Sequence, residues 1–590
     1  MRTRVTIASA LAAMWVCVCS AETPPGLPDT TFRQDELFTF ISQMPVVRDE
    51  DRVHTPLENP EFALLLNGYV VIPGRQHTSM FDFSDPYDPK LLNRVEMYEK
   101  HSHMPEMNGW GLTTGYGGVH LAHADTNSIT FWDFTDHMNA EEAGTVVLPH
   151  PINPGNCPTR RLGWGFPIAH AWQAPYLYSV MRGIGIDIVD VRDINNPVFV
   201  KRVDECGNGA QGYLSVGVVN VVGNLLIHSG HVYSRYIQVM DISDPENPVE
   251  LDFVGGGDTP LKNLYCGFIN GNRYFASGPA VWEYDISDPT NITFVRTYNR
   301  TGECDHECST GGTCVQDNFL HWGGSRTGYE KFDLTTGQSV GVTGPLTNPE
   351  KPDNPQYADM DLVTVFGNLT VVCSEDQYQV ITLVPHQSEP DRNPPVVNMV
   401  NPADGAQDMA TTSRIGFTFT DNIDHRSLST QTIIIRPEGG EAINGKYSVN
   451  KSIVNFSPDA CLEKNTCYEV VVPVGGVKDY AGNAITEEFT STFCTGESGN
   501  EEVCRKRAEM DPTAIVPGAV DLASGRGNGR IHCRAFMHGN DIPHESAGRI
   551  YDTRGRSIGS HETGLRRSLT KAKGVYLLVQ KGRQKTSADR

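Results

Sequence analysis

The chain has 590 residues, of which 39% are hydrophobic and 20% are charged, and its formal net charge is −23. This length is too great for a single hydrophobic core, so two or more domains are expected. The acidic balance argues against a nucleic-acid partner, because it creates no net basic field that would attract phosphates.

The N-terminus has the pattern of a secretory signal peptide. Arginines precede an apolar run over residues 5–18, and small residues that end at Ala21 are suited to cleavage. A lipid anchor on Cys17 or Cys19 is the alternative, although bulky residues precede both cysteines. No later stretch is apolar for long enough to span a bilayer. We expect a protein that is secreted or held at the cell surface, with no transmembrane segment after signal removal.

Shifts in composition divide the rest of the chain. The expected parts are a signal peptide 1–21, a lead-in segment 22–58, a repeat domain 59–388, a linker 389–395, a β-sandwich 396–496, a linker 497–514 and a small C-terminal β-domain 515–590. An amphipathic piece over residues 32–44 suggests that the lead-in packs on the next domain or stays loose. The predicted fold class is all-β.

One short pattern recurs through the repeat domain. Residues 237–248 read Ile-Gln-Val-Met-Asp-Ile-Ser-Asp-Pro-Glu-Asn-Pro, and related copies occupy residues 81–86, 186–197 and 282–289. Alternating apolar residues predict a strand with one buried face. The Asp-x-Ser-Asp-Pro part predicts a tight turn, in which Asp and Ser bond to nearby backbone amides. Repetition at a spacing of roughly 40–50 residues favours four-stranded sheets arranged around an axis, a β-propeller.

The repeat resembles the LVIVD repeat of secreted and surface proteins. That resemblance implies a β-propeller and no particular chemistry. We count seven units, which begin near Phe62, Gly111, Phe166, Ser215, Leu264, Thr313 and Ala358, with six or eight blades as the alternatives.

The sandwich region resembles the bacterial Ig-like domain of the SbsA type. Short alternating strands over residues 396–496 indicate a β-sandwich. Pro402-Ala-Asp-Gly405 at its start and Asp479-Tyr-Ala-Gly-Asn483 at its end match the pattern typical of that family. The resemblance implies a spacer or surface module. A calcium ion at residues 479–483 is the alternative to a turn.

The C-terminal region resembles the sorting domain of type IX secretion. Ile550-Tyr-Asp-Thr-Arg-Gly-Arg556 and a late Gly574-Val-Tyr576 match that family's paired strands, although its early Asn-Pro is replaced by Ile515-Val-Pro-Gly518. The resemblance implies the secretion machinery as a partner.

The cysteine count suits disulfides in an exported protein. Cys17 and Cys19 leave with the signal, and the remaining number is even. A zinc site at the bunched cysteines around His306 is the alternative, but its spacing fits poorly. The disulfide candidates are Cys304, Cys308, Cys314, Cys461, Cys467 and Cys494.

The long connections predict a ligand-binding face. In a propeller, the Ser-Asp-Pro turns lie on one face, and the longer connections emerge on the opposite face, where such scaffolds usually place function. Histidines at or just beyond the second strand of several units, with Trp and Arg on the connections, are expected at one rim there. The candidate residues are His77, His101, His103, Trp110, His123, Arg160, Arg161, Trp164, Arg182, His228, His231, His321 and Arg326.

Three chemistries suit such a rim. The imidazoles could hold a transition metal. Trp faces with His and Arg donors could bind a sugar or an anionic polymer. His with Arg could also abstract a proton, as in polysaccharide-cleaving propellers. The structural alternative is that a repeated histidine serves hydrogen bonds between neighbouring units. We favour a binding or scaffold protein for a polysaccharide or protein ligand, with no assigned cofactor. The second hypothesis is an enzyme on the same face: a polysaccharide lyase or hydrolase, or a metal-dependent oxidoreductase.

Overall fold

The computed structural model describes two compact units, one within residues 24–520 and one that contains the C-terminal strands. Each is considered by itself. No helix in the described part is both long and apolar enough to cross a membrane. The described residues are 29–45, 63–66, 69–73, 77–96, 115–116, 119–124, 128–149, 167–181, 185–203, 216–230, 235–256, 259–302, 311–345, 359–375, 380–508, 548–551, 557–560 and 577–580.

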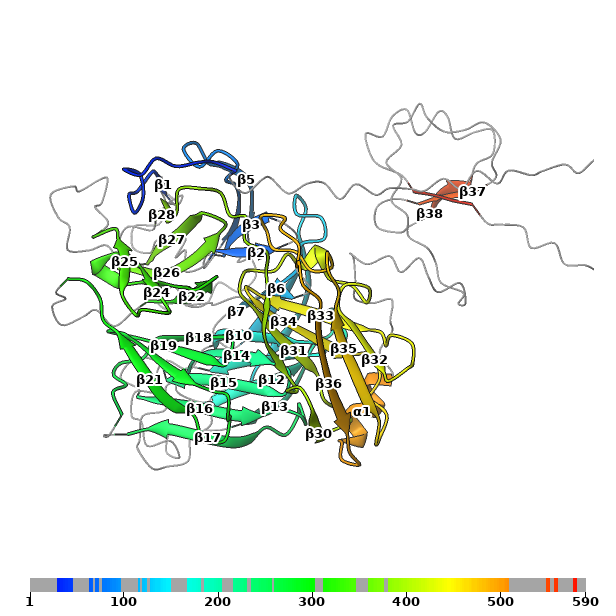
Figure 1. Cartoon of the computed structure of the whole chain (residues 1–590). Coiled ribbons are helices and arrows are strands. Elements are labelled where there is room, and N and C mark those ends of the chain that lie inside the picture. Colours follow the sequence, from blue (N-terminus) through cyan, green and yellow to red (C-terminus); the bar gives the residue numbers. More distant parts are fainter. Residues whose placement is uncertain are drawn as a thin grey trace, which may run out of the picture. The chain divides into compact units, whose positions relative to one another are not determined.

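Seven four-stranded antiparallel sheets follow one another in the described part of the larger unit (Figure 1). The first three sheets are β2 (Leu64–Leu66), β3 (Tyr69–Pro73), β4 (His77–Asp82) and β5 (Lys90–Glu96); β6 (Gly115–Tyr116), β7 (His120–Ala124), β8 (Ser128–Asp133) and β9 (Glu141–Val147); and β10 (Pro167–Gln173), β11 (Tyr176–Met181), β12 (Gly185–Asp190) and β13 (Val198–Val203). The next three are β14 (Val216–Val222), β15 (Leu225–Gly230), β16 (Tyr236–Asp241) and β17 (Val249–Gly255); β18 (Cys266–Asn270), β19 (Arg273–Ser277), β20 (Val281–Asp285) and β21 (Thr293–Tyr298); and β22 (Thr313–Gln316), β23 (Phe319–Gly323), β24 (Tyr329–Asp333) and β25 (Ser339–Val342).

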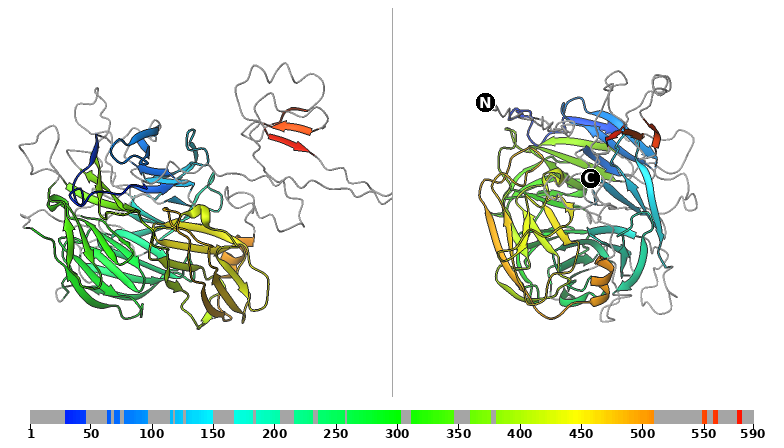
Figure 2. Two further views of the ribbon diagram at one scale, coloured as in Figure 1. Left: turned by 45° about the horizontal axis from the view of Figure 1, so that its top comes forward. Right: turned by 90° about the vertical axis from the view of Figure 1, so that its right-hand side faces the viewer.

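The seventh sheet combines three strands from the end of the repeat domain with one strand from the segment that precedes it. Its strands are β26 (Asp359–Phe366), β27 (Leu369–Glu375), β28 (Val380–Pro385) and β1 (Ser42–Pro45). β1 is antiparallel to β28, with Met44 opposite Ile381, and the dark blue N-terminal segment lies beside the green strands (Figure 2). Part of the expected lead-in segment therefore supplies an edge strand of the last sheet.

Paired aspartate turns join the third and fourth strands, as the repeat predicts. In the fourth sheet, the Ser243 amide donates to Asp241 Oδ1 (2.7 Å) and the Glu246 amide donates to Asp244 Oδ1 (3.1 Å). Turn capping thus accounts for the repeated acidic residues. The equivalent acceptors in four other sheets are Asp82 and Asp85, Asp133 and Asp136, Asp190 and Asp193, and Asp285 and Asp288.

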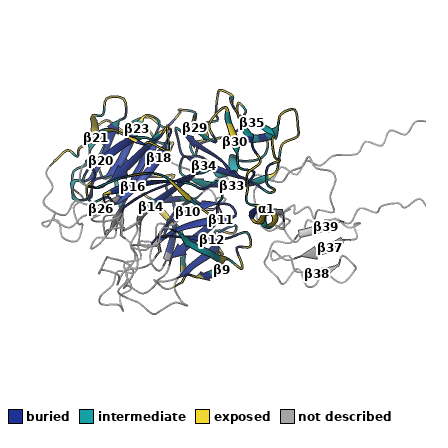
Figure 3. Cartoon of the chain, turned by 90° about the horizontal axis from the view of Figure 1, so that it is seen from below, coloured by how far each residue is buried: buried dark blue, intermediate teal, exposed yellow. Residues whose placement is uncertain are grey.

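Each sheet packs on the next through a shared apolar core. Leu66 of the first sheet and Phe134 beside the second belong to one buried cluster. Equivalent clusters join every later pair. The first and seventh sheets also share a cluster, which includes Val70 and Leu383. The buried inner strands and the more exposed outer strands such as β9 and β21 are distinguished in Figure 3.

Two further sheets form the expected sandwich, which we call the Ig-like domain. One contains β29 (Val397–Asn401), β31 (Ile415–Phe419), β34 (Ile453–Pro458) and β33 (Gly445–Asn450), and the other contains β30 (Ala406–Met409), β36 (Phe489–Thr495), β35 (Cys467–Val472) and β32 (Ile434–Pro437). Alternate residues such as Phe417 and Val470 meet in one core. Two short 3-10 helices, η1 (Ser325–Thr327) and η3 (His425–Ser427), lie in connections.

The expected linker 497–514 contains helix α1 (Glu501–Ala508). A disulfide between Cys461 and Cys504 ties this helix to the Ig-like domain. Arg507 at the end of α1 is buried and donates from Nη2 to the Thr412 carbonyl (2.6 Å). This part of the segment is therefore packed structure.

The C-terminal unit has three described strands, β37 (Gly548–Tyr551), β38 (Ser557–Ser560) and β39 (Leu577–Gln580), in the order β38-β37-β39. Tyr551 lies opposite Leu577. Gly574-Val-Tyr576 lies outside the described residues, and the sorting domain stays a prediction.

The Ig-like domain packs directly on one end of the sheets, with the yellow strands beside the green and cyan ones in Figure 1. We call this end the docked face; it comprises the turns after the first strands of the third to sixth sheets, at Gln173, Gly223, Gly271 and Asp317. The Gly271 amide donates to Thr418 Oγ1 (2.9 Å), and the Asp317 amide donates to the Thr420 carbonyl (2.5 Å). The Asp-Pro turn of the fourth sheet lies at the same end, because its Ser243 carbonyl accepts from Thr412 Oγ1 (2.6 Å).

The closest approach at this interface requires a glycine. A Cβ atom at Gly416 would lie 1.9 Å from the Gly223 backbone nitrogen. Asn455 completes the contact, since its Oδ1 accepts from the Gly223 amide (2.8 Å) and its Nδ2 donates to the Val221 carbonyl (2.8 Å). Buried backbone groups of the sheets are thereby satisfied by the Ig-like domain.

Candidate functional site

Three of the predicted rim histidines lie on second strands and are buried. His123 on β7 is 8% exposed, His228 on β15 is 0% exposed, and His321 on β23 is 1% exposed. His77 begins β4, just beyond the end of β3, and its side chain lies outside the described residues. The three described imidazoles thus occupy the body of the sheets, and a shared ligand-binding rim stays a prediction.

His321 belongs to a hydrogen-bonded group between the sixth and seventh sheets. Its Nδ1 is 2.7 Å from the Tyr329 hydroxyl, and its ring lies edge-on to that of His386, with 4.8 Å between centroids. His386 Nδ1 is 3.0 Å from Thr370 Oγ1. Burial holds the pKa of both histidines well below the usual value, and nearby Lys331 acts in the same direction. The hydrogen bond of His321 thus stays within the sixth sheet, and only its ring contact with His386 reaches the seventh.

Burial also lowers the pKa of two further histidines in the sheets. It lowers the pKa of His228 to about 4. It lowers the pKa of His170 to about 3, and the nearby His123 contributes to that shift. These side chains are neutral at pH 7. A neutral imidazole is suited to metal binding or hydrogen bonding but not to attracting an anion.

The remaining predicted contact residues divide into two groups. Arg326 lies in η1 and is half-buried. The others lie outside the described residues: His101, His103, Trp110, Arg160, Arg161, Trp164, Arg182 and His231.

A lysine from the Ig-like domain reaches the first strands of the sheets. Lys451 occupies the turn between β33 and β34 with φ of 56°, and its Nζ lies 5.4 Å from the centre of the Phe268 ring on β18. It borders a cavity of about 50 Å³ that is also lined by Leu64, Asn220 and Leu362 of the first, fourth and seventh sheets. Burial lowers the pKa of Lys451. Residues far apart in the chain therefore meet around one lysine.

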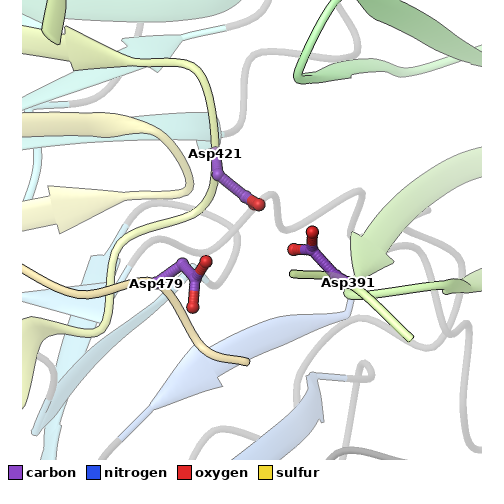
Figure 4. Close-up of side chains that lie close together, drawn as sticks. All are labelled: Asp391, Asp421 and Asp479. Atoms are coloured by element: carbon purple, nitrogen blue, oxygen red, sulfur yellow. The ribbon is translucent and has the colours of Figure 1, made fainter. Parts of the chain in front are cut away.

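Three carboxylates converge where the Ig-like domain meets the sixth sheet. Asp391 lies in the connection before β29, Asp421 follows β31, and Asp479 lies in the turn over residues 479–483, for which calcium is the alternative to a plain turn. Each is at most 3% exposed. One oxygen from each carboxylate lies within 4.8 Å of the other two, and the side chains point toward one another (Figure 4). We call these residues the aspartate cluster.

Nearby polar groups hold the aspartate cluster in place. Gln316 Nε2 donates to Asp391 Oδ2 (3.2 Å) and to Asp421 Oδ2 (3.0 Å). Asn483 donates to Asp479 from its backbone amide (2.8 Å) and from Nδ2 (2.9 Å). The two bonds from Asn483 to Asp479 form the turn that the sequence of residues 479–483 predicts.

Burial and mutual repulsion disfavour charge on these carboxyls. Burial, opposed by the Asn483 hydrogen bonds, raises the pKa of Asp479 to about 7. Burial and the neighbouring Asp391 raise the pKa of Asp421 well above its usual range. Carboxyls in this geometry either share protons or hold a hard cation, which prefers oxygen ligands.

A cleft of about 810 Å³ lies next to the aspartate cluster. Its lining includes Asp317, Asn393 and Thr420. Asn393 connects the cleft to the cluster, because its amide donates to Asp391 Oδ1 (2.9 Å) and its Nδ2 donates to Asp317 Oδ2 (2.8 Å). The carboxylates themselves do not line the cleft, and Asn393 lies between them and it.

Two disulfides are present among the described residues. Cys467 pairs with Cys494 within the Ig-like domain, and Cys461 pairs with Cys504. The prediction of a disulfide at Cys314 is wrong: this thiol is free and fully buried in β22, where core packing leaves it no partner cysteine. Cys304 and Cys308, and with them the zinc alternative, lie outside the described residues.

Sequence patterns gave only part of this geometry. The Asp479–Asn483 motif indicates one of the carboxylates. Asp391 lies in the expected linker. No local sequence pattern marks Asp421, Gln316 or Lys451 as part of a site. Their role depends on contacts between segments that are distant in the chain.

Comparison with known proteins identifies one region. Residues 391–495 match the family model of the bacterial Ig-like domain. That range contains all three carboxylates of the aspartate cluster. No curated protein matches the chain.

Proposed function

We propose that the seven sheets are the blades of a closed β-propeller. Three observations support this: the shared core of the first and seventh sheets, the strand that the N-terminal segment adds to the seventh sheet, and the bond from Thr364 Oγ1 to the Ala63 carbonyl (2.8 Å) between those sheets. The cavity beside Lys451, lined by first strands of several sheets, supports an axis there.

The propeller is proposed to act outside the cell as a binding or scaffold protein. Its ligand, a polysaccharide or a protein, would bind the face opposite the docked face. One observation carries this proposal: the Ig-like domain covers the docked face through buried hydrogen bonds, including those of Gly223 and Gly271. From the sequence, residues such as His101, Trp110 and Arg160 are expected in the connections at the other strand ends. Because the Ig-like domain occupies the docked face, a large ligand would bind at those opposite strand ends.

Glycan-array binding tests this proposal. The mature chain is compared with His101→Ala and Trp110→Ala, and with Val249→Ala as a control, because Val249 is 61% exposed on the outer strand β17. We expect at least tenfold weaker binding for the first two variants, since loss of a stacking ring or a hydrogen-bonding group typically costs one to a few kcal/mol. Equal binding by all variants would contradict the assignment of the face. Release of unsaturated sugar products would favour the lyase hypothesis instead.

An extracellular location is proposed on three grounds. The N-terminal signal pattern, the two disulfides and the match to a bacterial Ig-like domain all fit it. The C-terminal unit would direct sorting through the secretion machinery.

Removal of residues 515–590 tests the sorting role. The truncated protein should fold, because all of its described sheets and both disulfides precede residue 515. It should, however, fail to reach the cell surface, as judged by surface labelling and fractionation. Normal surface display of a folded truncation would contradict the sorting role.

A further inference from the structure

The aspartate cluster lacks a compensating positive charge among the described residues. None of the ion pairs that they form involves Asp391, Asp421 or Asp479. Buried carboxylates without a cation are strongly unfavourable when ionised, because removing them from water costs several kcal/mol each. The contacts from Gln316 and Asn483 supply dipoles but no charge.

Gln316 provides a second and independent indication of a ligand. Its side chain is 3% exposed and its amide lies against the cluster, yet its Oε1 has no hydrogen-bond partner. The oxygen and nitrogen ends of an amide exchange places on a half-turn of the group. With ionised carboxylates alone, Nε2 faces them. With a cation between the carboxylates, a half-turn of the amide would direct Oε1 to it, and Nε2 would exchange its bonds to Asp391 and Asp421 for the position that Oε1 holds now.

We propose that the aspartate cluster binds a calcium ion. Asp391, Asp421 and Asp479 would each supply carboxylate oxygen, and Gln316 would supply Oε1. All of these ligands are oxygens, which hard cations prefer and which do not suit zinc or copper as well as nitrogen or sulfur. Calcium fits better than magnesium, because magnesium usually keeps several waters and the cluster is nearly closed to solvent.

The ion would join three separate parts of the chain. Gln316 ends β22 of the sixth sheet, Asp391 lies in the connection to the Ig-like domain, and Asp421 and Asp479 belong to that domain. The adjacent cleft is lined mainly by polar residues, among them Asp317 and Asn393, together with Arg273. Calcium would therefore stabilise the docking of the Ig-like domain on the sheets. This role is independent of the proposed ligand face.

Calcium titration of the mature chain tests the site. At pH 7.5, after removal of metals with a chelator, calcium chloride should raise the melting temperature by about 3–8 °C in a saturating manner, because a ligand that binds only the folded state stabilises it. Magnesium chloride at the same concentration should give a smaller shift. Isothermal titration calorimetry should show one calcium ion bound at this site.

Two variants locate the binding. Asp421→Asn removes one charge, so the metal-free protein should melt at a higher temperature than the wild type and no longer respond to calcium. Gln316→Met retains the length of the side chain and should weaken calcium binding by about tenfold or more. Asp408→Asn is the matched control, since Asp408 is an exposed aspartate of the same domain, and its calcium response should equal that of the wild type.

Two results would overturn the proposal. One is a full calcium response in Asp421→Asn, which would place any bound calcium elsewhere. The other is no effect of calcium on the wild type together with stabilisation by a shift from pH 8 to pH 6. That result would mean that the carboxyls share protons rather than hold a cation.

Discussion

His228 shows what burial does to a titratable residue in the sheets. None of its side chain is exposed, and its ring meets that of Tyr236 edge to face at 5.7 Å. Burial penalises the charged form and lowers the pKa of His228 to about 4. In the unfolded chain the same imidazole titrates near 6.5. Its contribution to stability is therefore complete above that value and is lost as the pH falls toward 4.

Replacement of His228 should make the protein less sensitive to acid. Between pH 7.5 and pH 5.5, the wild type should lose about 1 kcal/mol more unfolding free energy than His228→Gln, because only the wild type has this histidine to protonate on unfolding. Urea unfolding at the two pH values measures the difference. The comparison of two proteins cancels contributions from other groups, and equal losses would show that His228 is not held neutral.

At the scale of single elements, β1 brings the N-terminal segment into the seventh sheet. It covers the edge of β28, with Ser42 opposite Leu383 and Met44 opposite Ile381. Without it, β28 would expose a row of unpaired amides and carbonyls. The nearby Phe32, only 1% exposed, packs in the core shared by the first and seventh sheets.

Removal of residues 22–45 should destabilise the sheets and promote self-association. Loss of the strand and of Phe32 should lower the unfolding free energy by about 4 kcal/mol or more, since the truncation of a buried Phe alone typically costs about 3–5 kcal/mol. Thermal unfolding and light scattering measure the two effects. A milder variant, Met44→Pro, introduces a residue that cannot donate to the ladder and should give a smaller change in the same direction. Unchanged melting of both variants would contradict a structural role for β1.

The elements themselves could largely be predicted from the sequence. The expected unit starts at Phe166, Ser215, Leu264 and Ala358 lie within two residues of β10, β14, β18 and β26, because alternation and aspartate turns are local signals. The strand partner of residues 42–45 could not be predicted, since β28 is distant in the chain. The same applies to the aspartate cluster, and to Cys314, which resembles a disulfide candidate by spacing but is a free, buried thiol.

At the scale of the whole described unit, buried hydrogen bonds connect the Ig-like domain to the sheets. Asn455 illustrates this: its Oδ1 accepts from Gln173 Nε2 (3.0 Å) and from the Gly223 amide. Arg414, fully buried, donates from Nη2 to the Ile242 carbonyl in the fourth sheet. An arrangement of this kind predicts that the two parts unfold together.

Asn455→Ala tests the coupling. The change leaves the Val221 carbonyl and the Gly223 amide buried without partners, so it should destabilise the sheets and the Ig-like domain by about 2–4 kcal/mol. Thr490→Ala, at an exposed position of β36, is the control and should change stability little. Calorimetry of the wild type should show one transition for both parts. Two transitions, of which Asn455→Ala shifts only one, would contradict cooperative unfolding.

The position of β1 has a consequence for biosynthesis. Translation delivers the N-terminus first, yet residues 42–45 find their hydrogen-bonding partners only when residues 380–383 have been made. Until then residues 42–45 have no strand to pair with, and the apolar residues of the first sheet that pack against the seventh sheet have no packing partner. The seventh sheet can therefore be completed only after almost the whole repeat region has been synthesised, so this one short strand sets when folding of the sheets can finish relative to translation.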